Sequence, residues 1–584
     1  MTAPTTFNAE PSVAGRRQSL GFKFDAITVV STIILLLLAV LVVPPVLILI
    51  YGSFTVPPPG VEYSGATIAN FVQIFEGRRL LAGLSNSIIV ATFATTLALV
   101  VGGTLAWLVE RTNVPFKKLA YLTCVVSLGT PYVVYAVSWL FLLGRVGPVN
   151  DLYRTLSGSS DILFNINSIT GMILVQGFIW CPVVFLLIAP AFRNANADME
   201  EAARMCGATV LETIYKISMK LALPAVVATA LLVFIGNIEA FDVPALVGMP
   251  GGINVLTTDI YEAIRLQPPN LGRACAHSVL MMIMVGVLFW FYNRVARNAD
   301  RFASITGKGY RPRAFDLGRA RWIGGAFILV SFIILLVLPL LALLWSALSP
   351  FPRPIRLANL SKITLSNFSN VLGSSDTLWL GLNTVLVAAG AATAAMTITV
   401  FAGWLSARRS RGGAIINQLA MAPFVFPGIV FGVAMMQIGL RVPVPIYGTL
   451  WLICLAFSIR YLPLGMRYAF SGVLQIHREL EEAAAVSGAT PLQRLRRIVA
   501  PLLSPAIISG WLFIFLVASK ELSIAVLLAG PRSQTIAVTM MEQWVNGQAG
   551  ELNALGLVWT AIMTVFAAAF YVVSQRRPSS SQTA

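Results

Sequence analysis

The sequence predicts an all-α polytopic membrane protein with about 12 transmembrane helices, arranged as two parallel six-helix repeats. Three observations predict this fold class. Hydrophobic residues make up 57% of the 584 residues, charged residues only 11%, and the mean hydropathy is +0.80. The apolar runs reach the length of about 20 residues that a helix needs to cross a bilayer. Two stretches, residues 200–225 and 481–506, almost repeat each other.

Twelve apolar runs are long enough to be transmembrane helices. The first follows a basic N-terminal tail, residues 1–26, that resembles the start of a signal peptide. Because the run is longer than a signal-peptide core and no convincing cleavage site follows it, we expect a retained helix. The expected spans are residues 27–51, 85–110, 119–143, 169–192, 221–248, 273–293, 322–348, 382–407, 415–440, 447–470, 503–530 and 553–574.

The chain divides at a basic linker, residues 294–321, into halves of six spans each, 27–293 and 322–575. A second pair of segments supports duplication: SNSIIVATFATTLALVVGGTLAWLVERT from Ser85 resembles LNTVLVAAGAATAAMTITVFAGWLSARRS from Leu382, which aligns Asn86 with Asn383. Six spans per half give both halves the same orientation, as in repeats related by an axis along the membrane normal.

The net charge of +17 reflects the topology of a membrane protein and does not indicate a nucleic-acid partner. The expected partner for this charge is membrane lipid. The basic residues lie in loops between spans, and no basic patch is interleaved with aromatics in a soluble domain. Lys and Arg are concentrated in the loops on one side, so the positive-inside rule places that side in the cytoplasm. Both termini, including the tail 576–584, are expected there.

The repeated stretches lie in cytoplasmic loops, near 194–220 and 471–502. At a constant offset of 281 they agree at 12 of 26 positions. Glu200, Ala203 and Gly207 are spaced to share one face of a helix, and small residues on that face allow close approach of another backbone. Gly207 can supply a turn into a second helix, and Pro224 and Pro505 suit the first turn of the next span. A helix lying at the lipid headgroups is the alternative, but two copies at equivalent positions disfavour it.

This pattern of Glu-Ala-Ala, Gly and an Ile-Pro region resembles the cytoplasmic loop motif of permease subunits of ATP-binding-cassette importers. The resemblance implies the type I importer fold, two copies of a cytoplasmic ATPase and an external substrate-binding protein as partners, and a bacterial inner-membrane location. Lys220 departs from the motif where the second copy has Pro501. The coupling residues that the resemblance implies are Glu200, Glu201, Ala202, Ala203, Gly207, Glu481, Glu482, Ala483, Ala484 and Gly488.

The chain is expected to be a transporter and not an enzyme. A phosphate-binding loop needs G-x-x-x-x-G-K-[ST], and the sequence holds no such string, because Gly307 and Lys308 are followed by Gly309. The string LSGSS at 156–160 resembles a cassette-ATPase signature but falls in an external loop. We therefore expect no cofactor in this chain and ATP bound by the partner subunit.

The segments EAFDVPALVGMPGGINVLTTDIYEAI (239–264) and KELSIAVLLAGPRSQTIAVTMMEQW (520–544) resemble ferric iron permeases. Phosphonate, polyamine and thiamine remain open as cargoes. No metal-ligand cluster is visible, since the five Cys have unrelated spacings and His277 beside Cys275 and the loop residue His477 are expected to be structural.

Four charges lie in the fifth and eleventh expected spans: Glu239, Asp242, Lys520 and Glu521. A charge in hydrocarbon is costly, so such residues usually pair or line a wet pathway. The 281 offset aligns Glu239 with Lys520, and we predict that Lys520 pairs between the halves with Glu239 or Asp242. The alternative is that all four lie at the external ends of their spans and contact water.

Two other function classes fit parts of the sequence. In an ion-coupled secondary transporter, Glu239, Asp242 and Lys520 would form a relay. The doubled loop motif argues against it. A non-transporting membrane scaffold explains neither the repeat nor the buried charges.

Overall fold

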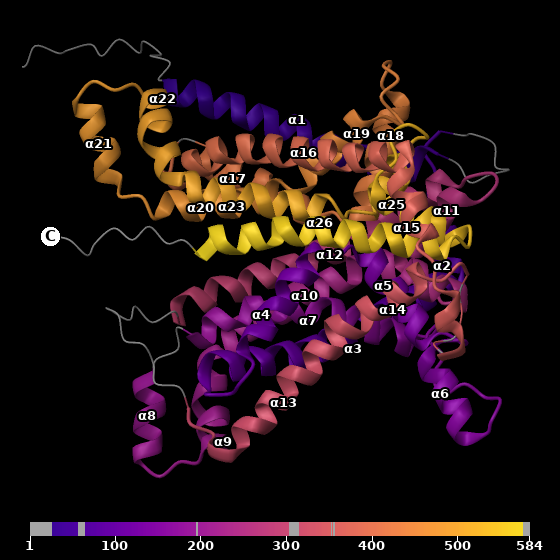
Figure 1. Ribbon diagram of the computed structural model, residues 1–584. Helices are drawn as coiled ribbons and strands as arrows, with labels where there is room; N and C mark the ends of the chain where they lie inside the picture. The colour runs from indigo at the N-terminus through magenta and orange to yellow at the C-terminus, as the bar shows by residue number, and fades with distance from the viewer. Residues whose placement is uncertain are drawn as a thin grey trace, which may run out of the picture.

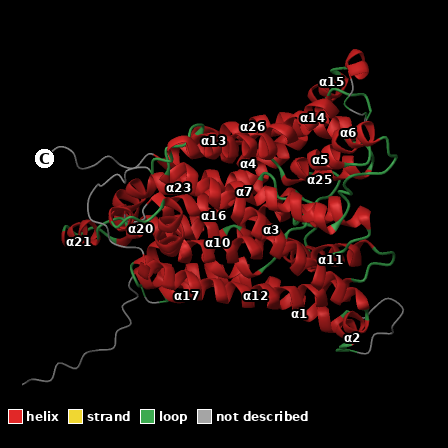
Figure 2. Ribbon diagram, turned by 90° about the horizontal axis from the view of Figure 1, so that it is seen from below, coloured by secondary structure: helices red, strands yellow, loops and turns green. Residues whose placement is uncertain are grey.

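The computed structural model describes residues 26–56, 65–193, 197–302, 315–351, 353, 355, 357–410 and 412–575. Within these residues every regular element is a helix, and one isolated bridge joins Thr112 to Phe315. The long helices run roughly side by side as a bundle (Figures 1 and 2). The expected N-terminal tail up to residue 25, residues 303–314 of the basic linker and the C-terminal tail lie outside the described residues.

The long helices occur in a corresponding order along the sequences of the two halves. Those of the first half are α1 (Ala26–Thr55), α3 (Arg78–Arg111), α4 (Lys117–Gly129), α5 (Tyr132–Leu143), α7 (Ile169–Arg193), α10 (Met219–Glu239) and α12 (Leu271–Phe302). Those of the second half are α13 (Arg321–Phe332), α14 (Leu338–Ala347), α16 (Ser375–Ala407), α17 (Gly413–Met421), α18 (Gly428–Arg441), α19 (Leu450–Arg460), α20 (Leu462–Leu474), α23 (Ala500–Ala518) and α26 (Ala549–Gln575).

Shorter helices lie at the two ends of the bundle. Figure 1 shows α8 and α21 at one end and α6, α11 and α15 at the other. The short helices are α2 (Ala69–Glu76), α6 (Pro148–Ser157), α8 (Ala197–Met205), α9 (Val210–Thr213), α11 (Leu256–Arg265), α15 (Ser366–Gly373), α21 (Arg478–Val486), α22 (Pro491–Arg494), α24 (Ala525–Leu528) and α25 (Ile536–Val545).

The expected number of spans is confirmed. Among the described residues, ten helices are long and apolar enough to cross a membrane, and counting each of two bent helix pairs as one span gives twelve. The bends are 103° between Gly413–Val425 and Gly428–Arg441, and 45° between Leu450–Arg460 and Leu462–Leu474. Apolar surface all round these helices lets them be buried in lipid or in each other.

Several spans are broken where the sequence analysis has continuous helices. The span 119–143 is split into α4 and α5 at Thr130 and Pro131, and 415–440 is split at Pro427. A proline lacks the N–H that continues a helix, so each begins a new one. The spans 221–248 and 503–530 are too long, because α10 ends at Glu239 and α23 at Ala518.

The first helix of each half contacts the other half, although α1 also packs along α12 of its own half. α1 contacts α17 and α18 of the second half, while α13 contacts α4 of the first. Within the halves, α3 packs along α7 and α16 packs along α20. One apolar core, which includes Val134, Phe241, Phe431 and Phe515, runs through both halves.

Candidate functional site

Both repeated stretches fold as helix, glycine turn, helix. In the first half α8 is followed by Gly207 and α9, and in the second α21 is followed by Gly488 and α22. The backbone φ angles are +86° at Gly207 and +83° at Gly488, a left-handed conformation that L side chains rarely adopt. The expected glycine turn is therefore present in both copies, which project from the same end of the bundle (Figure 1).

The second helix of each loop starts with the same cap. Backbone N–H groups of Thr209 and Thr490 donate to the side chains of Glu212 and Gln493 at 3.0 and 2.9 Å, and both threonine hydroxyls accept from the backbone N–H three residues on. This is a reciprocal capping box. The hydrogen bonds from Thr209, helped by Lys216, hold the pKa of Glu212 below its ordinary value.

The first glutamate of each copy points inward and anchors the loop. Glu200 is 2% exposed, forms an ion pair with Arg111 at the end of α3, and accepts from the Ser218 hydroxyl at 2.7 Å. Glu481 is 5% exposed and binds Arg408 at 2.7 Å.

Sequence reasoning gives these two glutamates a docking role, but their side chains contact their own chain. The neighbouring Ala202, Glu482 and Ala483 are exposed, Ala203 and Ala484 are half-buried, and the side chain of Glu201 lies outside the described residues.

Sequence reasoning missed the exposed apolar residues of these helices. Met205 and Val486 are both 90% exposed, and Met199 and Leu480 are 53% and 48% exposed. Each pair is related by the 281 offset, so the same apolar positions face outward in both loops. Matched, exposed apolar side chains on otherwise polar helices indicate a surface for a partner. The available signal was an apolar residue at the same place in each copy.

The prolines after the loops do not lie where the sequence analysis expects them. Pro224 and Pro505 are inside α10 and α23 and not in their first turns. A π-helical segment, Ile214–Ser218 or Leu495–Val499, precedes each long helix and extends it toward the loop. Lys220 and Pro501, the position where the first copy departs from the motif, are the second residues of α10 and α23, beyond α8 and α21.

The charges of the expected spans gather where helices break, in a set that we call the central cluster: Glu239, Asp242, Arg460, Lys520 and Glu521. Glu239 ends α10, Arg460 ends α19, Asp242 lies in the short helical turn after the break at the end of α10, and Lys520 and Glu521 lie in the irregular segment after α23. Such backbone breaks within a membrane bundle need polar partners and often line a substrate pathway.

The central cluster connects the halves. Arg460 Nη2 lies 2.8 Å from Glu239 Oε2, and its Nη1 donates to the Pro423 carbonyl at 2.9 Å. Lys520 Nζ donates to the Leu128 carbonyl at 3.2 Å and lies 4.4 Å from the ring centroid of Tyr132. Both cations of the second half thus contact the first half.

The predicted pairing of Lys520 with Glu239 is wrong, because Arg460 occupies that carboxylate. The 281 offset made Lys520 and Glu239 equivalent positions of the two halves. Equivalent positions related by a two-fold axis contact each other only if they lie close to that axis. No ion pair links Lys520 to Asp242 among the described residues, and one Asp242 oxygen, Oδ1, is buried without a hydrogen-bond partner. Arg460 was visible as a charge inside an expected span.

The remaining members of the cluster are also enclosed by protein. Glu521 accepts from the Tyr461 hydroxyl at 3.0 Å. Asp242 and Lys520 are 8% and 5% exposed. The alternative that these charges lie at span ends and contact water is not supported by this burial. Their role in the pathway stays a prediction.

The described residues contain no group of three or more His, Cys, Asp or Glu side chains that could hold a metal ion. His277 is buried and its Nδ1 lies 3.1 Å from the Arg273 carbonyl, while Cys275 is fully buried. His477 precedes α21 as its N-cap residue.

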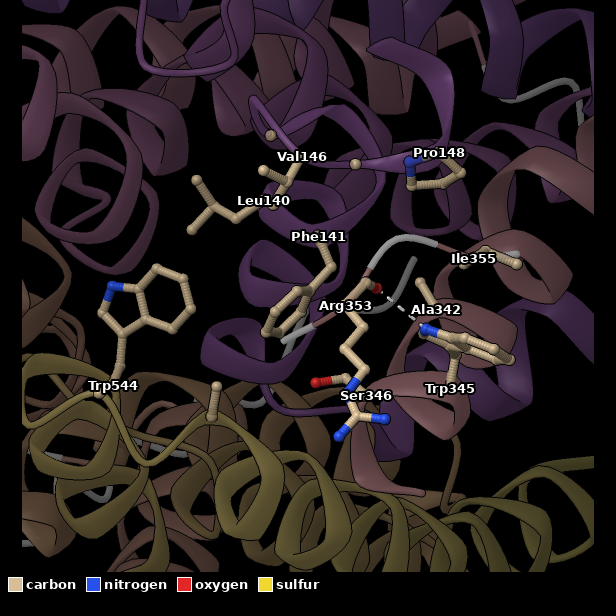
Figure 3. A pocket seen from close by; sticks show the side chains of 14 residues that line it. Leu140, Phe141, Val146, Pro148, Ala342, Trp345, Ser346, Arg353, Ile355 and Trp544 are labelled. Atoms are coloured by element: carbon tan, nitrogen blue, oxygen red, sulfur yellow. Dashed lines mark hydrogen bonds between the residues drawn. The ribbon is translucent and has the colours of Figure 1, made fainter. Parts of the chain in front are cut away.

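A separate cavity of about 340 Å³ lies at the opposite end of the bundle from α8 and α21. Figure 3 shows Phe141, Trp345 and Trp544 around it, with the Trp345 indole donating to the Arg353 carbonyl at 3.1 Å. No residue of the central cluster lines it.

Comparisons with known proteins match both halves. The family model for the binding-protein-dependent transport system inner membrane component matches residues 94–301 and 395–577. The ferric transport system permease protein FbpB of Actinobacillus pleuropneumoniae is 26% identical over 540 residues, covering 89% of this chain and 75% of that protein.

Two other relatives cover different shares of the chain. A probable ABC transporter permease protein, y4fN, of Sinorhizobium fredii is 24% identical over 86% of this chain and 89% of its own length. The putrescine transport system permease protein PotI of Escherichia coli K12 is 31% identical over 32% of this chain and 70% of its own. The duplicated spans, the paired loops and the match over both halves show that this chain belongs to the inner-membrane components of binding-protein-dependent transport systems.

Proposed function

We propose that the chain supplies both transmembrane halves of the permease of an ATP-driven importer, with two separate ATPase subunits docked on α8 and α21. The observation that carries the proposal is the pair of matching loops, each with a buried glutamate anchor, a left-handed glycine turn and an outward apolar residue. One ATPase on each loop would let closure of the ATPase pair move both halves together. The α8 and α21 end, with both termini, faces the cytoplasm.

The substrate pathway passes between the halves at the central cluster. Here the broken helices bring three carboxylates and two cations into one buried region that both halves share. An external binding protein delivers the cargo at the end that carries α6 and α11.

The cargo that we propose is ferric iron. Relatives that cover most of the chain are named for ferric transport, and this likeness is what supports iron. A phosphonate, polyamine or thiamine importer of the same class is the alternative; one partial relative is named for putrescine.

Reconstitution tests this function. Proteoliposomes holding the chain, its ATPase and its binding protein should accumulate radioactive ferric iron only when ATP is supplied on the side of the membrane where the ATPase lies. Putrescine, thiamine and 2-aminoethylphosphonate should not accumulate under the same conditions. ATP-driven uptake of one of these compounds in the absence of iron would show that iron is not the cargo. The chain would still be the permease of an ATP-driven importer.

The chain itself carries no ATPase function in this proposal. Purified permease should neither bind nor hydrolyse ATP until the ATPase subunit is added, since the sequence has no phosphate-binding loop. A secondary transporter that uses the buried charges of the central cluster as a relay would instead drive uptake from a proton gradient without ATP, which the same vesicles can measure.

A further inference from the structure

The anchor of the first coupling loop differs from that of the second. In the second half, Trp404 donates from its indole N–H to Glu481 at 2.9 Å, and Arg408 also donates to the Ile476 carbonyl at 3.0 Å. In the first half the corresponding indole nitrogen of Trp107 is buried without a hydrogen-bond partner. Two nitrogens of Arg111, Nε and Nη1, are likewise buried and unpartnered. Fewer hydrogen bonds therefore orient the Arg111 and Glu200 pair.

The end of the inter-half linker covers this weaker anchor. The Phe315 backbone N–H donates to the Arg111 carbonyl at 2.7 Å, and the Asn113 N–H donates to the Phe315 carbonyl at 3.1 Å. The Phe315 side chain is 3% exposed, and the Arg111 guanidinium carbon lies 5.8 Å from its ring centroid, within the range of a cation–π contact. Arg111 is thus held by Glu200 and by a linker residue.

Side chains extend the same contact along the linker. Asn113 Nδ2 donates to Asp316 Oδ1 at 2.6 Å, and the Leu317 N–H donates to Asn113 Oδ1 at 3.1 Å. Immediately after, Gly325 of α13 lies so close to Pro115 that an added Cβ would be 2.5 Å from the proline ring. The linker therefore ends in a fixed position on the turn between α3 and α4.

We propose that residues 315–317 form a clasp that positions Arg111, and through it Glu200 and the first coupling loop, for docking of the ATPase. This inference rests on the proposed function. The clasp residues are positioning residues: they contact the anchor and not the ATPase. Through the clasp, the linker that joins the halves also sets the orientation of one of the two loops on which an ATPase docks.

The chain offers a local probe of each loop. Cys206, next to Gly207, is exposed, whereas Cys124, Cys181 and Cys275 are buried and Cys454 is half-buried. Ser487 is the equivalent residue of the second loop, so a Cys206→Ser, Ser487→Cys chain reports on that loop. Maleimide labelling is measured in native membranes of the whole transport system, before and after an alkaline wash removes the ATPase, and after purified ATPase is added back.

Without a clasp substitution, the ATPase should slow labelling at Cys206 in the wild-type chain and at position 487 in the Cys206→Ser, Ser487→Cys chain. Phe315→Ala and Asp316→Ala should raise the labelling rate at Cys206 with ATPase present by about fivefold, the occupancy change expected for loss of one cation–π contact in the first variant and one hydrogen bond in the second. Labelling at position 487 should stay slow. Asp316 is exposed, so its variant keeps the test valid if Phe315→Ala fails to fold.

The matched control is Trp322→Ala, which removes a 58% exposed aromatic side chain from the start of α13 without touching the clasp. It should leave both positions protected. Continued protection of Cys206 in the two clasp variants would overturn the inference, and so would equal loss at both positions, because the clasp contacts only the first anchor. Absence of protection in the wild-type chain would reject the docking function itself, and the clasp with it.

Discussion

At the scale of single residues, burial decides which charges are structural. Arg460 and Glu239 come from different halves, and their side chains are 16% and 12% exposed at a separation of 2.8 Å. Charges removed from water gain from pairing only when the geometry is good, and removing one partner leaves the other uncompensated. The pair therefore makes correct association of the halves a condition for burying either group.

Replacing one member of this pair should cost more than replacing both. We expect Arg460→Ala and Glu239→Ala each to lower the stability of the purified permease by about 3–5 kcal/mol, the usual cost of an orphaned buried charge. The double variant should recover part of that loss, as measured by thermal unfolding in detergent. Combining Lys520→Ala with Glu239→Ala is the control, in which the two effects should add. Additivity in the Arg460 cycle would refute the pairing.

The glycines at the turns of the two loops should be sensitive to substitution because of their backbone conformation. An added Cβ at Gly207 or Gly488 meets nothing within 4 Å, so the left-handed backbone is the only obstacle to alanine. Gly207→Ala and Gly488→Ala should cost about 1–2 kcal/mol locally and reduce ATPase co-purification moderately. Gly207→Arg and Gly488→Arg should abolish it, because a long cation is added to the docking surface, while membrane levels stay near normal. Unchanged uptake in both arginine variants would remove the loops from the coupling mechanism.

At the scale of elements, the apolar faces of α8 and α21 carry a further expectation. Burying a side chain such as Met205 or Val486 stabilises a complex by about 1.5–3 kcal/mol, and an aspartate there would have to be desolvated. Met205→Asp and Val486→Asp should each weaken ATPase binding at least tenfold, since 1.4 kcal/mol corresponds to that factor. The control is Leu156→Asp on α6, a 78% exposed leucine at the opposite end of the bundle. Binding measured by ATPase titration of permease in nanodiscs should not change for that variant.

The elements also show which features a sequence reveals. Hydropathy finds spans because a membrane helix is apolar over its whole length, and the repeat located both coupling loops and their glycine turns. The breaks at Pro131 and Pro427 were missed, although the prolines were visible, because a window average does not register one lost hydrogen bond. The Arg460 partner of Glu239 was missed for another reason: contact between spans depends on packing, which periodicity within one span does not contain.

At the scale of the whole molecule, the two halves are intertwined and not merely linked. α1 lies against α17 and α18, and α13 lies against α4, so each half covers apolar surface of the other. Lys520 and Arg460 likewise contact Leu128 and Glu239 across the boundary. In a half produced on its own, these helices would lack the packing partners that cover their apolar surface. Glu239 would lack its counter-ion.

Separating the halves tests this interdependence. Residues 1–302 and 303–584, produced as two chains, should each accumulate poorly when made alone, because membrane quality control removes proteins with unpaired buried charges and uncovered helices. Made together, they should associate, co-purify and recover much of the uptake, since the contacts between halves do not require a covalent link. Arg460→Ala in the second fragment should reduce this recovery, whereas the surface change Trp451→Ala, at an 81% exposed residue, should not. If either fragment alone accumulated to the level of the intact chain, the halves would be independent folding units, and the crossed helices and the central cluster could not be what holds them together.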